Sequence, residues 1–144
     1  MKIFITTLLF ITSLLGARID EFAKEVGYLR DYNSALKIAK KENKMIMLVV
    51  VADYCPWCKK FERKTLQSLS ISTKIKKDFI PAIVDKYREK EHYPKKYNSS
   101  AIPGVFFIDP NTENSIYKSI SYVNKKDFSL SIDEALNSYK EVSK

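Results

Sequence analysis

Residues 53–60, DYCPWCKK, contain both cysteines of this 144-residue sequence, and two residues separate them. A continuous apolar run, residues 45–51, precedes this segment, and a lysine-rich amphipathic stretch, residues 59–69, follows it. The pattern predicts a buried strand, a sharp turn and a helix, with Cys55 at the helix entrance. Both cysteines therefore lie at the predicted junction between the strand and the helix.

The position of Cys55 predicts a reactive thiol. Unpaired N–H groups in the first helical turn and the helix dipole stabilise a thiolate there and lower its pKa. Pro56 suits the first helical position, because its missing N–H would be unpaired in any case. Cys58 lies one turn deeper, close enough to attack a mixed disulfide formed at Cys55. The segment thus predicts thiol–disulfide exchange, with Cys55 as the nucleophile and Cys58 as the resolving thiol.

A zinc site and a structural disulfide are weaker alternatives for the cysteine pair. A structural zinc site needs four ligands, and the only other soft ligand in the chain is His92. A structural disulfide that spans two residues restrains little chain, because the stabilisation grows with loop length. We therefore expect no metal and no other cofactor.

The first 17 residues have the pattern of a secretory signal. Lys2 gives a positive start, residues 3–16 form an apolar core too short to span a bilayer comfortably, and Ala17 suits cleavage. We expect a signal peptide over residues 1–17 and one domain over residues 18–144, outside the cytoplasm. An uncleaved N-terminal anchor is the alternative. In an oxidising compartment, a protein stabilised by structural disulfides would contain more than these two cysteines. This pair is therefore expected to perform chemistry.

The formal net charge of +8 raises the question of a nucleic-acid or anionic-membrane partner. Acidic residues are interleaved with the basic ones, lysine outnumbers arginine, and basic and aromatic residues form no common stripe. This pattern favours solvated charged faces. We therefore expect no nucleic-acid binding.

The remaining segments alternate between strand and helix patterns. Strands are predicted over residues 45–51, 79–85, 101–109 and 115–122, the last two as a hairpin. Helices are predicted over residues 31–42, from Pro56 to about residues 68–70, and over residues 125–142. Residues 74–78 are expected to be a short helix or turn, and residues 87–100 are expected to contain a helix with Pro94 at its start. Residues 20–30 have only a weak pattern and are expected to be a lead-in. The order predicts an α/β domain with a mixed sheet and helices on both faces.

Over about residues 28–139 the chain resembles the thioredoxin-fold family. Two features are specific in combination: the strand-to-helix C-P-W-C, and Ile102-Pro103 at the start of a strand about 45 residues further along. That spacing matches the family's cis-proline loop, which lies against the active-site cysteines and helps to dock the substrate backbone. The resemblance implies a thioredoxin fold, a cis bond at Pro103, and substrate binding by Ile102 and Pro103.

In detail, residues 52–65 are similar to the active-site helix of the periplasmic thioredoxin-like domain of the DsbD reductant transporter and its single-domain relatives. The resemblance implies that Glu62 lies near the buried thiol, where a desolvated carboxylate with a raised pKa would accept the proton of Cys58. The alternative is a surface glutamate paired with a lysine. Tyr54, Pro56 and Trp57 are the candidates for a substrate-binding rim, although Tyr54 and Trp57 would equally suit a cover over the core edge.

Two positions differ from the family pattern. Thioredoxins and the DsbD domain carry a buried aspartate six residues before the first cysteine, where this chain has Val49. Proton transfer at Cys58 must then depend on Glu62 or on water. Tyr54 stands where thioredoxins usually have tryptophan.

The resemblance implies a periplasmic thiol–disulfide oxidoreductase. Isoleucine before the proline, here Ile102, resembles the residue found at that position in reducing thioredoxins, so we expect a reductase. Its expected clients are oxidised cysteines of secreted proteins or c-type apocytochromes, and its expected electron donor is a membrane thiol transporter of the DsbD type. We expect a monomer. The alternatives are an oxidase or isomerase, or a binding or chaperone module, which usually has lost one cysteine.

Overall fold

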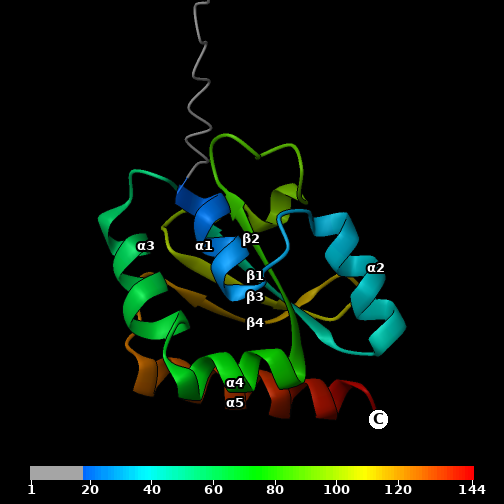
Figure 1. Cartoon of the computed structure of the whole chain (residues 1–144). Coiled ribbons are helices and arrows are strands. Elements are labelled where there is room, and N and C mark those ends of the chain that lie inside the picture. Colours follow the sequence, from blue (N-terminus) through cyan, green and yellow to red (C-terminus); the bar gives the residue numbers. More distant parts are fainter. Residues whose placement is uncertain (1–17) are drawn as a thin grey trace, which may run out of the picture.

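The computed structural model describes residues 18–144, so the predicted signal segment lies outside the described residues. A four-stranded mixed sheet in the order β2-β1-β3-β4 forms the centre, and helices cover both faces (Figure 1). The strands are β1 (Met45–Val51), β2 (Phe79–Asp85), β3 (Gly104–Ile108) and β4 (Ser115–Ile120). The helices are α1 (Arg18–Val26), α2 (Tyr32–Glu42), α3 (Pro56–Phe61), α4 (Leu69–Asp78) and α5 (Lys125–Val142). The predicted α/β architecture is confirmed.

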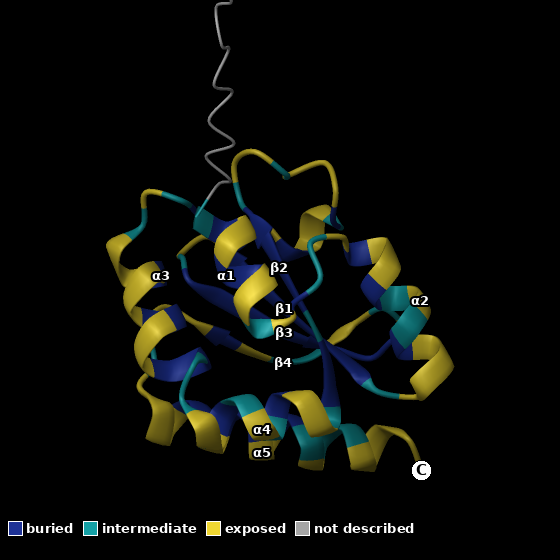
Figure 2. Ribbon diagram, in the orientation of Figure 1, coloured by how far each residue is buried: buried dark blue, intermediate teal, exposed yellow. Residues whose placement is uncertain are grey.

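Strand β1 is central and buried along its whole length (Figure 2). It pairs in parallel with β2 and antiparallel with β3, so both of its edges are satisfied. Side chains alternate between the two faces of a strand, and both faces of β1 meet an apolar cluster. One cluster packs β1 against α1, α3, α4 and α5, and the other packs it against α2 and two tyrosines of a long loop. This two-sided cover explains the continuous apolar run.

The lead-in predicted for residues 20–30 is wrong, because the chain there begins with helix α1. Ile19, Phe22 and Ala23 are buried against the sheet, and Val26 packs beside them. These positions follow the i, i+3, i+4, i+7 spacing of an amphipathic helix. The helix is only nine residues long, so the pattern is brief in the sequence.

The helix predicted within residues 87–100, with Pro94 at its start, is reduced to a single short turn. Only a 3-10 turn, η2 (Lys95–Tyr97), forms there, after Pro94. The segment is held instead by its ends: Asp85 accepts hydrogen bonds from the backbone of residues 87 and 88, and Tyr93 and Tyr97 are buried in the α2-side cluster. Burial of Tyr93 and Tyr97 therefore holds this charged loop against the domain, although the loop forms no helix with an apolar face.

The other elements lie near their predicted positions. The β3–β4 hairpin is antiparallel and α5 has the expected bounds. Val142 at the end of α5 is 65% exposed, because the core ends near Tyr139. The helix of the cysteine motif is α3, which continues as a π-helical turn, η1 (Glu62–Leu66), and α4 begins earlier than predicted. Across residues 18–144, no helix has the length and apolar character needed to cross a membrane.

Candidate active site

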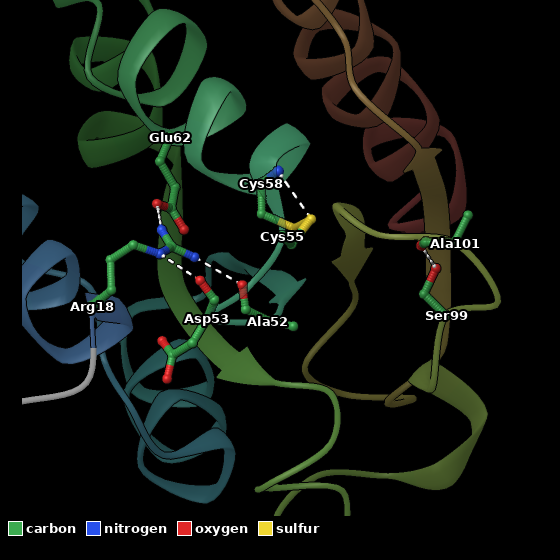
Figure 3. The surroundings of a disulfide bond; sticks show 8 residues. All are labelled: Arg18, Ala52, Asp53, Cys55, Cys58, Glu62, Ser99 and Ala101. Carbon is green, nitrogen blue, oxygen red and sulfur yellow. Dashed lines mark hydrogen bonds and ion pairs between the residues drawn. A yellow bond between two sulfur atoms is a disulfide. The ribbon is translucent and has the colours of Figure 1, made fainter.

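The two cysteines lie where the loop after β1 enters helix α3. Cys55 is the N-cap of the helix and Pro56 occupies its first turn, as the sequence predicts. A disulfide joins Cys55 and Cys58, whose Cα atoms are 5.2 Å apart. The backbone N–H of Cys58 donates a hydrogen bond of 3.1 Å to Sγ of Cys55 (Figure 3). In the reduced protein the same N–H would favour a thiolate at Cys55.

The two cysteines differ in how deeply they are buried. Cys58 is fully buried in the apolar cluster that also contains Val49, whereas Cys55 is only partly covered. An incoming disulfide therefore reaches Cys55 and not Cys58. Burial in apolar surroundings also disfavours a thiolate at Cys58, so that sulfur needs a proton acceptor before it can react.

The loop before β3 borders the same site. The bond between Ile102 and Pro103 is cis. Pro103 is buried, and its carbonyl accepts a hydrogen bond of 2.8 Å from the N–H of Ser121. Ile102 is half-buried and packs against both apolar clusters. Ile102 thus lies at the surface end of the core, beside the cysteines.

A groove of about 530 Å³ opens next to Cys55. Its walls come from the loop after β1, the end of β2 with the loop that follows, and the turn before β3. The lining residues are Ala52, Asp53, Tyr54, Cys55, Asp85, Tyr87, Arg88 and Ile102. Tyr87 and Arg88 were not among the predicted site residues, because nothing local in their sequence places them next to the cysteines.

The aromatic residues of the motif do not cover the core. Tyr54 is 100% exposed and Trp57 is 56% exposed. The Trp57 ring packs on Tyr122 at 5.4 Å between centroids, and Nζ of Lys60 lies 4.9 Å from the Trp57 centroid and 4.7 Å from that of Tyr122. Pro56 between the cysteines is exposed as well. Tyr54, Pro56 and Trp57 therefore present an apolar surface around Cys55.

The polar wall of the groove is a chain of ion pairs. Arg88 pairs with Asp53 and also with Asp85, whose Oδ2 lies 3.2 Å from Arg88 Nε. Burial opposes ionisation of Asp85, but hydrogen bonds from the backbone of Arg88 and Tyr87 and the Arg88 guanidinium lower its pKa overall. Asp85 is thus held as a carboxylate that fixes the start of the long loop.

Glu62 lies one helical turn beyond Cys58, and its backbone N–H donates to the carbonyl of Cys58. The residue is 2% exposed, so the surface glutamate considered as an alternative is wrong. One carboxylate oxygen, Oε2, pairs with Arg18, whereas Oε1 is buried without a hydrogen-bond partner. Burial raises the pKa of Glu62, Arg18 opposes this, and the net direction is upward.

Arg18, like Tyr87 and Arg88, is a site residue that the sequence does not predict. Its guanidinium donates to the carbonyl of Ala52 at 2.8 Å and to that of Asp53 at 3.1 Å, in addition to Glu62 (Figure 3). It therefore ties α1 to the loop before Cys55 and to the helix that carries Cys58. Arg18 and Glu62 are 44 positions apart in the sequence, and no local pattern connects them.

A zinc site at the cysteine pair would need further ligands close to the two sulfurs. Within residues 18–144, no three side chains of the His, Cys, Asp and Glu types gather closely enough to hold a metal ion. The disulfide occupies the two sulfurs that would have been the first ligands.

Comparison with known proteins agrees with this geometry. Residues 32–136 match the thioredoxin-like domain. The chain belongs to this family. Among curated proteins, none matches it in sequence.

Solved structures with the thioredoxin fold are similar to the chain. A thioredoxin from Thermus thermophilus superposes with a TM-score of 0.67 at 18% identity, covering 76% of this chain and 86% of that one. The DsbH oxidoreductase gives 0.63 at 21% identity, covering 76% and 83%. The reduced C-terminal domain of DsbD from Neisseria meningitidis gives 0.58 at 22% identity, covering 74% and 92%. At these identities, the likeness shows the shared fold.

In this thioredoxin-like domain, the predicted site residues are distributed around one cysteine pair. Cys55 and Ile102 line the groove, Cys58 and Pro103 are buried, and Glu62 is buried one helical turn beyond Cys58, where it pairs with Arg18 of α1. The domain therefore combines an accessible sulfur, a buried sulfur and a buried carboxylate. That is the arrangement of a thiol–disulfide oxidoreductase.

Proposed function

We propose that this thioredoxin-like protein is a thiol–disulfide oxidoreductase that reduces protein disulfides in the periplasm. The observation that carries the proposal is the pairing of a partly exposed Cys55 with a fully buried Cys58 at the start of α3. The two sulfurs have different access and different stabilisation, as the two steps of disulfide exchange require.

The reaction begins with the reduced pair. The Cys55 thiolate attacks one sulfur of the client disulfide, an S–S bond forms between protein and client, and the second client sulfur leaves as a thiolate. Cys58 then gives its proton to Glu62 and attacks Sγ of Cys55. The Cys55–Cys58 disulfide forms and the first client sulfur leaves as a thiolate. Two electrons pass from the dithiol to the client, and the client thiolates take protons from water.

Tyr54, Pro56 and Trp57 form the rim on which the client segment docks, and Ile102 and Pro103 border it on the other side. Exposed aromatic rings beside a groove give a large apolar contact at a low cost in conformational entropy. The exposure of Tyr54 and Trp57 supports this role, since neither ring contributes a buried surface to the core.

The environment of Cys55 supports the reducing direction. A strong oxidant has a strongly stabilised thiolate. Here three cations near the motif are bound by other groups: Arg18 by Glu62, Arg88 by Asp53 and Asp85, and Lys60 over two aromatic rings. The hydrogen bond from Cys58 N–H stabilises the thiolate, while Ile102 and the carboxylate of Asp53 disfavour it. The balance keeps the reduced form less stable than in an oxidant.

The protein would receive electrons from a membrane thiol transporter of the DsbD type. Its clients would be secreted proteins with oxidised cysteines, including c-type apocytochromes. The domain over residues 18–144 would act as a monomer after removal of the signal peptide over residues 1–17.

Equilibration with glutathione buffers tests the direction. The fraction of reduced protein should give a potential of about −200 mV or lower, on the side of thioredoxin rather than the ~ −120 mV of the strong periplasmic oxidant. A potential close to that of the oxidant, with a Cys55 pKa well below about 5, would make the protein an oxidase. Insulin reduction with dithiothreitol provides an independent assay of reductase activity.

A further inference from the structure

A second cavity, of about 280 Å³, lies between α1 and the helix that carries Cys58. Its walls are mostly charged, and they include Arg18, Glu21, Glu25, Lys59, Glu62 and Arg63. It shares no lining residue with the groove beside Cys55. A client over Cys55 would therefore leave this polar side of the active-site helix uncovered.

Arg18 and Glu62 meet at this cavity. Glu62 is almost completely buried, and a buried carboxylate without a charged partner takes up a proton. Arg18 supplies that partner at Oε2, and Oε1 keeps its lone pairs free of any hydrogen bond. Since Glu62 follows Cys58 by four residues, both side chains belong to one face of the helix. The oxygen without a partner thus belongs to the helix face that carries the buried thiol.

The guanidinium is fixed in place from several sides. Besides Glu62, it donates to the carbonyls of Ala52 and Asp53, and the backbone N–H of Ile19 donates to Oδ1 of Asp53 at 3.3 Å. Ile19 itself is fully buried in the core. Arg18 is thus anchored to the loop that leads to Cys55, and its charge cannot turn away to solvent without breaking these contacts.

We propose that Arg18 is a positioning residue of the active site: by pairing with Oε2 of Glu62, it keeps this carboxylate ionised and leaves Oε1 free to take the proton of Cys58. The proposal deepens the proposed function, because it rests on Glu62 acting in the second step of the exchange. No family position in the cysteine motif indicates this role, which comes from α1.

The resolving step transfers one proton and one electron pair. The S–H bond of Cys58 breaks and its proton goes to Oε1 of Glu62. The electron pair on Cys58 Sγ forms the bond to Cys55 Sγ, and the bond between Cys55 and the client breaks, with its electron pair on the client sulfur. Glu62 later gives its proton to water on the side of the charged cavity.

The charges around Glu62 give the direction of the effect. Burial raises the pKa of Glu62, Arg18 lowers it, Asp53 raises it, and Arg63 lowers it. Glu21, Glu25 and Lys59 face the same cavity from α1 and α3. Without Arg18, burial and Asp53 are opposed only by Arg63. The pKa therefore rises further, and a smaller fraction of Glu62 is ionised and able to accept a proton.

Stopped-flow reaction of the reduced protein with Ellman's reagent tests the proposal. Attack by Cys55 releases the first thionitrobenzoate and attack by Cys58 releases the second. Arg18→Gln should slow the second release about tenfold at pH 7, since each unit of pKa changes the ionised fraction tenfold. The acid limb of its pH profile should move to higher pH. The first release should change much less.

Three variants separate charge from structure. Lys64→Gln removes a positive charge from an exposed site on the same helical stretch and should leave both releases unchanged. Arg18→Lys keeps the charge and should retain most of the rate of the second release. In a Glu62→Gln background, Arg18→Gln should not slow the second release further, because the group through which Arg18 acts is gone.

Infrared spectroscopy reports the protonation of Glu62 independently of activity. Arg18→Gln should gain a protonated-carboxyl band at neutral pH that is absent from the wild type and from the double variant with Glu62→Gln. No such band, or an equal slowing in the Glu62→Gln background, would overturn the proposal. If Glu62→Gln alone leaves the second release unchanged, the catalytic use of Glu62 fails, and with it the functional meaning of the pair. The protonated-carboxyl band would then show separately whether Arg18 keeps Glu62 ionised.

Discussion

Ser99 occupies the space that a side chain at Gly104 would need. A Cβ built on Gly104 would lie 2.6 Å from Oγ and 2.9 Å from Cβ of Ser99. The Ser99 hydroxyl donates to the carbonyl of Ala101, which holds the turn in front of Ile102 and Pro103 (Figure 3). The absence of a side chain at the first residue of β3 thus lets this turn pack closely beside the active site.

Gly104→Ala should destabilise the protein by about 1–3 kcal/mol, because the new methyl group must displace a buried side chain. Denaturant unfolding measures the cost. Adding Ser99→Gly removes both clashing atoms and should recover part of the loss, which appears as a coupling energy in a double-mutant cycle.

Gly27→Ala is the matched control for this cycle. Gly27 has φ of +76° with open space around it, so its cost of about 1 kcal/mol should come from the backbone alone. Ser99→Gly should not change that cost. If Gly104→Ala behaves in the same additive way, close packing with Ser99 does not explain the glycine.

Cys55 should hold the reactive thiol of the pair. In Cys58→Ser, thiolate absorbance should titrate below the ordinary cysteine pKa of about 8.5, because the sulfur of Cys55 accepts the N–H of residue 58. In Cys55→Ser, the pKa of Cys58 should lie above that value, because the residue is fully buried. Cys58→Ser should also accumulate mixed disulfides with clients, whereas Cys55→Ser should not. A lower pKa at Cys58 would reverse the two roles.

Trp57→Ala and Tyr54→Ala should weaken the reduction of a protein client more than they weaken the fold. We expect kcat/KM for insulin to fall about 3- to 30-fold, equivalent to about 0.7–2 kcal/mol of binding. The rate with a small disulfide reagent should change little, because such a reagent makes no use of the rim.

Leu69→Ala provides the control for the two aromatic variants. Leu69 is 81% exposed at the start of α4, outside the groove, so its removal should leave insulin reduction unchanged. The free energy of unfolding should change by less than about 0.5 kcal/mol for Tyr54→Ala and Leu69→Ala. Equal loss with protein and small-molecule disulfides would argue against a docking rim.

The elements predicted best from the sequence have a clear and sufficiently long pattern of apolar residues. β1 is a run of seven apolar residues buried on both faces, and α5 repeats its apolar positions over 18 residues. Helix α1 has the same kind of spacing over only nine residues, which is too short to distinguish it from a lead-in. A longer pattern predicts a helix more reliably, because each additional turn repeats the apolar spacing.

The site was predictable only where its chemistry is local. Cys55 and Cys58 are adjacent on one helical turn, so the motif itself predicts their relation. Arg18 reaches Glu62 because α1 packs on the sheet, and Arg88 reaches Asp53 because the long loop is held by buried tyrosines. These contacts depend on tertiary packing between distant segments, and composition and spacing carry no information about them.

The carboxylate at the end of β2 should make stability depend on pH. Oδ1 of Asp85 accepts hydrogen bonds from the backbone N–H groups of Tyr87 at 2.8 Å and of Arg88 at 2.9 Å. Its pKa is lowered in the folded protein, below the unfolded value of about 3.9. A lowered carboxyl pKa adds stability above the unfolded pKa, and this contribution is lost as the pH falls through the folded pKa.

Asp85→Asn should therefore cost about 1–2 kcal/mol in the free energy of unfolding at pH 7, because it removes the charge from these hydrogen bonds. The difference from the wild type should shrink below about pH 4, where the wild-type carboxyl also takes up its proton. Asp133→Asn is the control, since exposed Asp133 pairs with Lys74 at 2.7 Å and should contribute less than about 1 kcal/mol. A cost for Asp85→Asn that is equal at neutral and acid pH would show that shape rather than charge matters at this position. Because Tyr87 and Arg88 line the groove beside Cys55, the same variant should also raise KM for insulin at neutral pH.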